Sequence, residues 1–225
     1  MPLATCMRSL CMWLLLGIAG TAQALEECQL NVSEAQVDFG LMSRLAQHDG
    51  APERLLGERR LSVNVNCPQA EDLSLFYRAL AATPQRLQFT EHGSYAIEVG
   101  NAVLDGRAVE LGLLTAAGQP PVMSATVLEW RPGHGIAPIE QGAVLMGKTL
   151  SLQLTLRAWA GVAAIQARDA TTWEVSGMLY GASHGRYREL TLRAHFAPVA
   201  CLPTLSDHGV VDYGTLYAKD LSATN

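Results

Sequence analysis

Apolar and polar residues alternate along much of this 225-residue chain, and the alternation has the period of a β-strand. The clearest run is 149–157, where leucine occupies every second position from Leu150 to Leu156. Successive side chains of a strand point to opposite faces, so this period places the leucines on one face, whereas a helix would scatter them. The run therefore predicts a strand with one buried face.

Further runs of the same period are followed by residues that favour turns. Alternation recurs at 61–65, 95–99 and 190–196, and breakers such as Pro68 and the glycines at 181 and 185 lie between the runs. Asp105-Gly106, set between two apolar runs, predicts a tight hairpin. Only the stretch 41–56 suggests a turn or two of helix. About ten strands at this spacing predict an all-β protein of the sandwich type with little helix.

The first 24 residues have the pattern of a secretory signal peptide. Arg8 precedes an apolar run from Leu10 to Ala19, and Ala22-Gln23-Ala24 supplies the small residues that a signal peptidase needs. The run is shorter than the roughly 20 residues of a membrane span, and no second candidate for a transmembrane helix follows. We therefore expect cleavage after Ala24; the alternative is an uncleaved membrane anchor.

Export changes the interpretation of the cysteines. Cys6 and Cys11 leave with the signal peptide, and Cys28, Cys67 and Cys201 reach a compartment where disulfides persist. Cys28 and Cys67 are both in phase with the apolar residues of their strands, so a bridge between them would join two strands. The alternatives are two free buried thiols, or a bridge from one of them to Cys201.

A formal net charge of −5 argues against one class of partner. Removing the signal peptide removes a positive charge and leaves the chain more acidic still. A nucleic-acid-binding domain carries a basic surface, so we expect no nucleic-acid partner.

One sequence block occurs twice. Cys28 is followed, after a serine, by Val37-Asp38-Phe39-Gly40, and Cys201 is followed in the same order by Val211-Asp212-Tyr213-Gly214. A strand start followed by a glycine bend explains each block separately. Two copies indicate the starts of two homologous domains. We therefore divide the chain into a signal peptide (1–24), one β-sandwich domain (25–198) and the start of a second, incomplete domain (199–225).

The first block resembles the first strand of bacterial chaperone–usher fimbrial subunits, where an early cysteine is bridged to one about forty residues on. The segment from Leu190 to Thr224 resembles a family of poorly characterised fimbria-like periplasmic proteins, in which an alternating strand and Pro-x-x-Cys precede the block; Pro198 to Cys201 stand in those positions. The resemblance implies an immunoglobulin-like, pilin- or adhesin-type β-sandwich with a Cys28–Cys67 disulfide. Cys201 then remains unpaired.

The same resemblance implies a structural or adhesive fimbrial subunit, exported to the periplasm and then to the fimbrium or cell surface. Its partners would be a periplasmic pilus chaperone that acts by strand addition, an outer-membrane usher and other fimbrial subunits, with a surface glycan or protein as receptor. Shaft subunits carry a donor extension ahead of the first cysteine, and only Leu25 to Glu27 stand there in the mature chain. This departure is typical of a tip subunit.

Two alternatives remain. The protein is a free periplasmic binding or regulatory protein of the same fold, or a truncated remnant of a longer two-domain protein. An unfilled edge beside the last strand of the 28–198 domain would favour strand donation, and a complete sheet would favour the free periplasmic protein.

Residue patterns for catalysis or metal binding are absent from the sequence. The six histidines occur singly, without HxH, HExxH or CxxC spacing, and no GxSxG, Walker or dinucleotide motif occurs. We expect no catalytic residues, metal or cofactor. Trp130, Trp159 and Trp173 are candidates for stacking on a sugar, with core packing as the alternative. His134, in a glycine-rich turn, is a fourth candidate for ligand binding, with an ordinary loop as the alternative.

Overall fold

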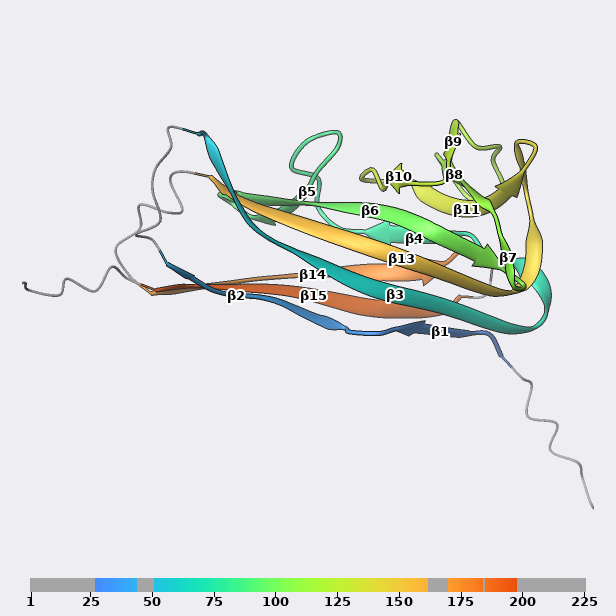
Figure 1. The fold of residues 1–225 in the computed structure, drawn as a ribbon, viewed down its shortest axis with the longest axis horizontal. Coiled ribbons are helices and arrows are strands. Elements are labelled where there is room, and N and C mark those ends of the chain that lie inside the picture. Colours follow the sequence, from blue (N-terminus) through green and yellow to red (C-terminus); the bar gives the residue numbers. More distant parts are fainter. Residues whose placement is uncertain (1–26, 44–50, 162–169, 184, 198–225) are drawn as a thin grey trace, which may run out of the picture.

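The computed structural model describes residues 27–43, 51–161, 170–183 and 185–197. In these residues, fifteen strands form two sheets that lie against each other (Figure 1). The predicted all-β, immunoglobulin-like sandwich with one disulfide is confirmed. The described residues contain no helix that is long and apolar enough to cross a membrane. The predicted signal peptide and the second cysteine block, with Cys201, lie outside the described residues.

Sheet A is antiparallel throughout and follows the order β1-β3-β13-β6-β10, with β5 and β7 also paired to β6. Its strands are β1 (Gln29–Val32), β3 (Glu53–Asp72), β5 (Leu87–Thr90), β6 (Gly93–Leu104), β7 (Arg107–Ala108), β10 (Leu128–Glu129) and β13 (Met146–Gly161).

Sheet B follows the order β2-β15-β14-β4-β11-β8-β9, with β12 also paired to β11. Its strands are β2 (Gln36–Ser43), β4 (Leu75–Arg78), β8 (Glu110–Leu114), β9 (Met123–Ala125), β11 (Gly135–Glu140), β12 (Ala143–Val144), β14 (Thr171–Gly181) and β15 (Tyr187–Ala197).

The core lies between the two sheets and is built from alternate residues of the long strands. In β13 the predicted leucine row from Leu150 to Leu156 is buried, and the even-numbered residues of β15 from Leu190 to Phe196 face it from the other sheet. Each fully buried leucine contributes roughly 1.5–3 kcal/mol relative to an exposed one. The period-two pattern seen in the sequence is therefore the pattern of the core.

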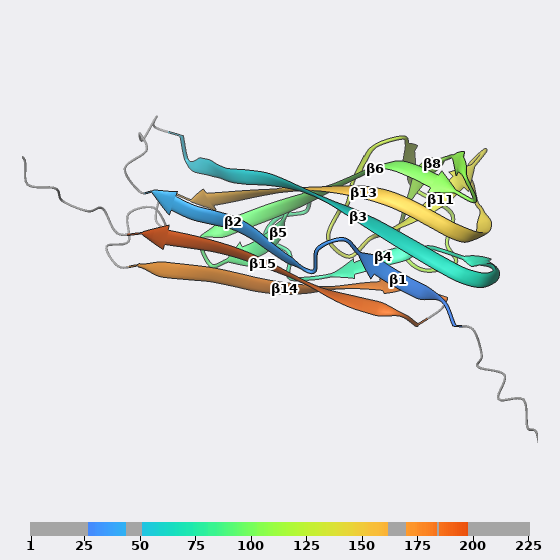
Figure 2. The ribbon, with the colours of Figure 1, turned by 60° about the horizontal axis from the view of Figure 1, so that its bottom comes forward.

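The chain changes sheets between β1 and β2. Strand β1 pairs antiparallel with β3 in sheet A, whereas β2 pairs parallel with β15 in sheet B, from Gln36 opposite Thr191 onward (Figure 2). Along its other side β15 pairs antiparallel with β14. The last described strand thus lies between two neighbours, and sheet B is complete at the place where a missing last strand would leave an open edge.

The predicted hairpin at Asp105-Gly106 is present between β6 and β7. Both residues have a positive φ, 48° and 80°, as a two-residue hairpin turn requires. The Asp105 carboxylate accepts hydrogen bonds from the backbone N–H of Thr149 at 2.7 Å and of Lys148 at 3.0 Å. These bonds, led by that from Thr149, lower the pKa of Asp105. They also join the turn to the neighbouring strand β13.

Two local predictions need correction. Pro68 does not end a strand, because β3 continues through it to Asp72. The pairing of β3 with β13 is irregular between Asn66 and Glu71, so the missing N–H of the proline interrupts no regular ladder. The stretch expected to hold some helix is strand at 41–43 and 53–56, and 44–50 lie outside the described residues.

A buried pair of tyrosines bridges the two sheets. The hydroxyls of Tyr77 in β4 and Tyr95 in β6 are 3.1 Å apart and hydrogen-bonded. Burial raises the pKa of Tyr77 to about 12 and raises that of Tyr95 further above its usual value. Both hydroxyls therefore stay protonated, and each satisfies the other inside the core.

Candidate ligand-binding site

The structure brings Trp130 and His134 together, but in a packing role. Trp130 is 2% exposed, and its indole N–H donates to the carbonyl of His134 at 2.9 Å. The backbone N–H of His134 donates to the carbonyl of Arg131, which closes a turn with Gly133 at a φ of 74°. The His134 ring contacts the carbonyl of Pro132. A buried indole has no free face for a sugar, so Trp130 is a core residue.

The other two tryptophans also have occupied faces. Trp173 is 8% exposed and packs against Phe196 and Phe89, with ring centroids 4.6 and 5.5 Å away. Trp159 is half-buried, and the Arg86 guanidinium lies 4.1 Å from the centroid of its ring. Trp173 therefore lies in the core, and Trp159 is shielded by a neighbouring cation.

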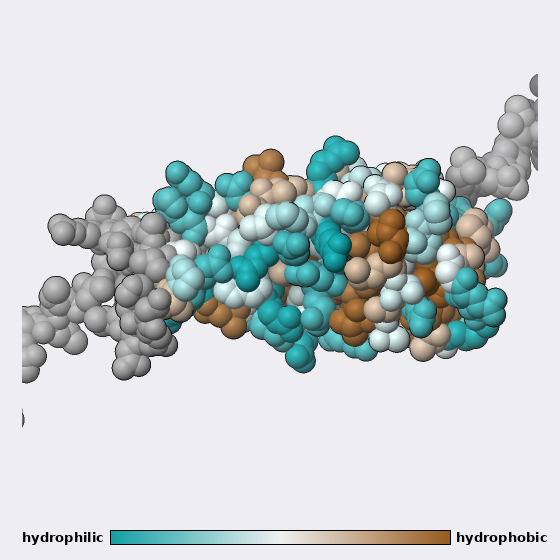
Figure 3. Space-filling view, turned by 90° about the horizontal axis from the view of Figure 1, so that it is seen from above, coloured by the Kyte–Doolittle hydropathy of each residue, from teal (hydrophilic) through white to brown (hydrophobic). Residues whose placement is uncertain are grey.

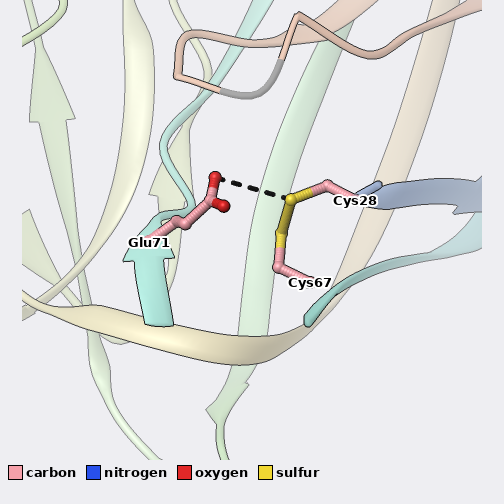
Figure 4. A group of neighbouring side chains, drawn as sticks. All are labelled: Cys28, Cys67 and Glu71. Atoms are coloured by element: carbon pink, nitrogen blue, oxygen red, sulfur yellow. Dashed lines mark hydrogen bonds between the residues drawn. A yellow bond between two sulfur atoms is a disulfide. The ribbon is translucent and has the colours of Figure 1, made fainter. Parts of the chain in front are cut away.

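A disulfide joins Cys28, the residue before β1, to Cys67 in β3 (Figure 4). Gln29 is in register with Asn66, so the cysteines stand opposite each other on neighbouring strands. An oxygen of Glu71 lies 3.5 Å from the sulfur of Cys28. Cysteine binds a metal as a thiolate, and both sulfur atoms are used in the S–S bond. The three side chains therefore do not form a metal site while the disulfide is intact.

A cavity of about 670 Å³ lies beside this disulfide. It is lined by residues 27–30, by residues 66–68, and by Arg186 and Arg188. Glu27 forms an ion pair with Arg186, and Arg188 donates to the carbonyl of Tyr187 at 3.2 Å. The cavity follows the gap between β1 and the start of β15. Its lining includes no aromatic ring, and one of its two arginines is neutralised.

The outer face of sheet A carries a charged row. Arg157 in β13 donates to Glu58 at 3.0 Å and to Glu98 at 3.3 Å, from strands on either side. The hydrogen bond to Glu58 raises the pKa of Arg157 most, and its counterpart lowers the pKa of Glu58. The charged groups of this row are paired with one another, so the Arg157 guanidinium is not free to bind an anionic ligand.

The outer face of sheet B changes character along β14 and β15. Toward the end of β15 it carries polar cross-strand pairs: Ser176 with Thr191 at 2.9 Å, and Arg193 with Glu174 at 2.6 Å. In the same part of the face, His195 lies 3.1 Å from the hydroxyl of Thr172 and 3.6 Å from Asp38. This threonine–histidine–aspartate row stands on an open sheet face, where the side chains of His195 and Asp38 are exposed, and it does not line the cavity beside the disulfide. It therefore offers no enclosed place for a substrate.

Toward the start of β15 the same face becomes aromatic. Phe76, Tyr180 and Tyr187 stand in register on β4, β14 and β15, and we call them the aromatic row. Phe76 stacks on Tyr180 with centroids 5.7 Å apart and an interplanar angle of 26°. Gly135, in register with Phe76 on β11, leaves room for that ring, because a Cβ there would lie 2.8 Å from the Phe76 Cδ1. Phe76 and Tyr180 belong to a second apolar cluster outside the main core, so packing holds these two rings of the aromatic row in place.

A hollow of about 210 Å³ lies beside the aromatic row, and we call it the tyrosine hollow. Its lining consists of Arg78, Met178, Tyr180, Gly181, Gly185 and Tyr187. Tyr187 is 60% exposed and Met178 is 40% exposed, so their apolar surface faces solvent. The Arg78 guanidinium lies 5.5 Å from the centroid of Tyr180. Exposed aromatic surface beside a polar group is the usual composition of a small-molecule site.

Another exposed apolar surface lies near β9. Val122, Met123 and Val127 are all largely exposed there. Figure 3 shows much of the apolar surface of that face toward its right-hand side, where β8 to β11 lie in Figure 1. The tyrosine hollow combines exposed aromatic surface with a guanidinium, so it is the stronger candidate site.

The tyrosine hollow is not among the sites expected from the sequence. The four residues that the sequence suggested for ligand binding, Trp130, His134, Trp159 and Trp173, do not line it. One signal was available: Tyr180 and Tyr187 stand at equal distances from the centre of the turn between two alternating runs, so a hairpin there places them opposite each other. Arg78 comes from a strand far away in sequence, and no local pattern points to it.

Residues 190–225 match a family described as "Protein of unknown function (DUF1120)". The match begins in β15 and otherwise falls outside the described residues. No curated protein matches the chain.

Solved structures with some likeness to this fold include three fimbrial proteins. The CupB6 tip adhesin from Pseudomonas aeruginosa has 12% identity and a TM-score of 0.42, over 76% of this chain and 42% of that chain. CfaE, the adhesive subunit of CFA/I fimbria of enterotoxigenic Escherichia coli, has 9% identity and a TM-score of 0.38, over 77% of this chain and 49% of that chain. AggA, the major subunit of aggregative adherence fimbriae type I from Escherichia coli, has 8% identity and a TM-score of 0.28, over 76% of this chain and 96% of that chain. The chain thus spans less than half the length of the first two.

Proposed function

We propose that this chain is an exported, adhesin-like fimbrial subunit without enzymatic activity, and that residues 27–197 form its ligand-binding domain. The observation that supports the fimbrial role most is the cysteine block, which opens the domain at Cys28, where the Cys28–Cys67 disulfide ties it to the sandwich, and which recurs from Cys201. Because β15 is already paired with β14 on one side and with β2 on the other, this sandwich needs no strand from a neighbouring subunit. It is therefore free to present a binding surface.

Strand addition by a chaperone or a neighbouring subunit would then involve the residues after β15. The second cysteine block, from Cys201 to Gly214, follows β15 directly in the sequence and repeats the pattern that opens the first domain. In this proposal a periplasmic pilus chaperone captures that part of the chain. An outer-membrane usher and other fimbrial subunits then carry the protein to the cell surface, where a glycan or protein receptor binds the first domain.

The test uses the full chain, produced with its own signal peptide in a bacterium that supplies a fimbrial chaperone and usher. We expect a mature N-terminus at Leu25, co-purification with the chaperone, and labelling of the protein on intact cells by an antibody. A mature protein that is found only in the periplasm, as a stable monomer without the chaperone, would overturn the fimbrial role.

A matched pair of variants locates the assembly site. Val211→Asp puts a charge into the second block, and Ala223→Asp puts the same charge outside it. We expect Val211→Asp to lose the chaperone and Ala223→Asp to keep it, while both keep a folded first domain with its disulfide. Equal retention of the chaperone would contradict the role given to the second block.

The completeness of sheet B favours a second candidate, a free periplasmic binding protein of the same fold. This alternative predicts cleavage after Ala24 as well, but no chaperone complex and no surface labelling. Antibody labelling of intact cells therefore separates the two candidates, because both predict the same mature protein and the same folded domain.

A further inference from the structure

We propose that the tyrosine hollow is the ligand site of this domain, and that its ligand is a sugar carrying a carboxylate. The inference rests on the proposed ligand-binding function and names its site and ligand class. Three properties of the hollow support it: its aromatic surface, its cation and its place on the molecule.

The aromatic surface supplies the apolar part of the contact. Tyr187 and Tyr180 stand side by side on neighbouring strands, and Met178 extends the apolar surface along β14. Sugars present a face of C–H groups that packs on an aromatic ring, and tyrosine adds a hydroxyl at the edge of that contact. The base of the site is rigid because Tyr180 stacks on Phe76, which is itself buried. The hollow has the size of a single sugar ring rather than of a peptide.

The cation supplies selectivity. Arg78 lines the hollow and contacts the ring of Tyr180, and no carboxylate within the described part of the chain forms an ion pair with it. Other arginines of the domain, such as Arg157 and Arg193, are paired with glutamates. A guanidinium matches the planar fork of a carboxylate and donates two parallel hydrogen bonds to it. A neutral sugar would leave this donor unused.

One acidic neighbour opposes this ligand and provides a control. Glu189 is exposed and stands opposite Met178 on β15, but it does not line the hollow. Its charge weakens the attraction for an anion without entering the contact. Removing that charge should therefore strengthen the binding of an acidic sugar.

The place of the hollow suits a receptor site. In Figures 1 and 2, β15 runs from one end of the domain to the other. The hollow lies where β15 begins, beside the turn from β14. The chain leaves the sandwich at the opposite end, toward the second block. A ligand in the hollow is thus distant from the end at which the domain continues into the rest of the chain.

The experiment measures the binding of matched sugars to the full mature chain by NMR titration. The probes are methyl β-D-glucuronide and methyl β-D-glucoside, which differ only in a carboxylate for a hydroxymethyl group, together with the methyl glycosides of galacturonic and N-acetylneuraminic acid. For an open site of one sugar ring, we expect a dissociation constant on the order of 1 mM for at least one acidic probe. We expect at least about tenfold weaker binding of its neutral counterpart, because the paired charge contributes a charge-assisted hydrogen bond.

Exposed residues carry the variants, so the fold is expected to survive, and urea unfolding checks this. Arg78→Gln and Tyr187→Ala should each weaken the binding of the acidic probe about tenfold. Tyr187→Phe should retain most of the affinity, because it keeps the aromatic ring. Glu189→Gln should strengthen the binding, because it removes a nearby negative charge. Arg107→Gln, an exposed arginine in β7, is the matched control and should have no effect.

Three results would overturn the inference: no acidic probe binds, the neutral sugar binds equally well, or binding is unchanged in Arg78→Gln and Tyr187→Ala. None of these affects the fimbrial proposal, which is decided by surface labelling and chaperone capture. Conversely, a protein confined to the periplasm that still binds the acidic sugar through Arg78 would refute the fimbrial role and keep the site.

Discussion

Gly177 in β14 is the position where a single added methyl group should damage the core most clearly. A Cβ there would overlap the hydroxyl and Cζ of Tyr77 and lie 2.9 Å from its Cε2. Tyr77 cannot move away freely, because it is buried, packs near Trp130 and holds the hydrogen bond to Tyr95. Gly177→Ala must therefore displace the tyrosine or the strand.

The cost has two parts. Overpacking a well-filled core by one methyl group costs roughly 1–3 kcal/mol. Moving Tyr77 also breaks the buried bond and leaves the hydroxyl of Tyr95 without a partner, which costs roughly another 1–3 kcal/mol. We expect Gly177→Ala to lower the free energy of unfolding by about 3 kcal/mol, measured by urea denaturation with tryptophan fluorescence.

Gly57→Ala in β3 is the matched control, because the nearest atom to its added Cβ is in Phe39 at an ordinary 3.5 Å. It should change stability by no more than about 1 kcal/mol, with alanine reducing the entropy of the unfolded chain. Placing Tyr77→Leu in the Gly177→Ala background should recover at least about 1 kcal/mol relative to additivity. A loss below about 1 kcal/mol in Gly177→Ala, or strict additivity with Tyr77→Leu, would refute the steric argument.

Three further perturbations test other parts of the domain. Replacing Cys28 and Cys67 together by serine should cost roughly 4 kcal/mol of stability on the chain-entropy estimate, and dithiothreitol should destabilise the parent chain but not this variant. Asp105→Asn keeps a residue that tolerates the turn but loses the charge. Because the pKa of Asp105 is lowered in the folded state, the stabilisation by its carboxylate is present at neutral pH and is lost as pH falls below about 4. The difference in Tm between Asp105→Asn and the parent chain should therefore shrink at low pH. A difference in Tm that does not depend on pH would contradict this. Arg157→Met should cost less than about 1 kcal/mol, because the ion pairs are partly exposed, and the difference should fall in high salt.

The long strands were predictable because their burial pattern is local. Each of the runs at 61–65, 149–157 and 190–196 has one face in the core and one outside, so alternation alone identifies them. The short strand β4 was not predictable in this way. Its Tyr77 faces the main core and its Phe76 the second apolar cluster, so both faces are buried and the alternation disappears.

In the candidate site, too, the local features are predictable from the sequence and the non-local ones are not. The two tyrosines of the hollow follow from one hairpin and are within reach of sequence reasoning. Arg78 joins them only because β4 pairs with β14, a non-local contact that no turn signal specifies. Tryptophan is a residue type that stacks on sugars, yet Trp130 and Trp173 are in the core, where such side chains bury a large apolar area. Exposure, rather than residue type, separates the candidates.

The parallel pairing of β2 with β15 also determines the order in which the domain is able to fold. Gln36 and its partner Thr191 stand near opposite ends of the domain's sequence, so this pair forms only once nearly the whole domain is available to fold. Contacts between residues so distant in sequence make folding slow and leave intermediates with unpaired strand edges. Until β15 arrives, β2 has no neighbour in its sheet and one side of the core is uncovered. For that interval the newly made chain is most open to proteases and to capture by another protein's strand.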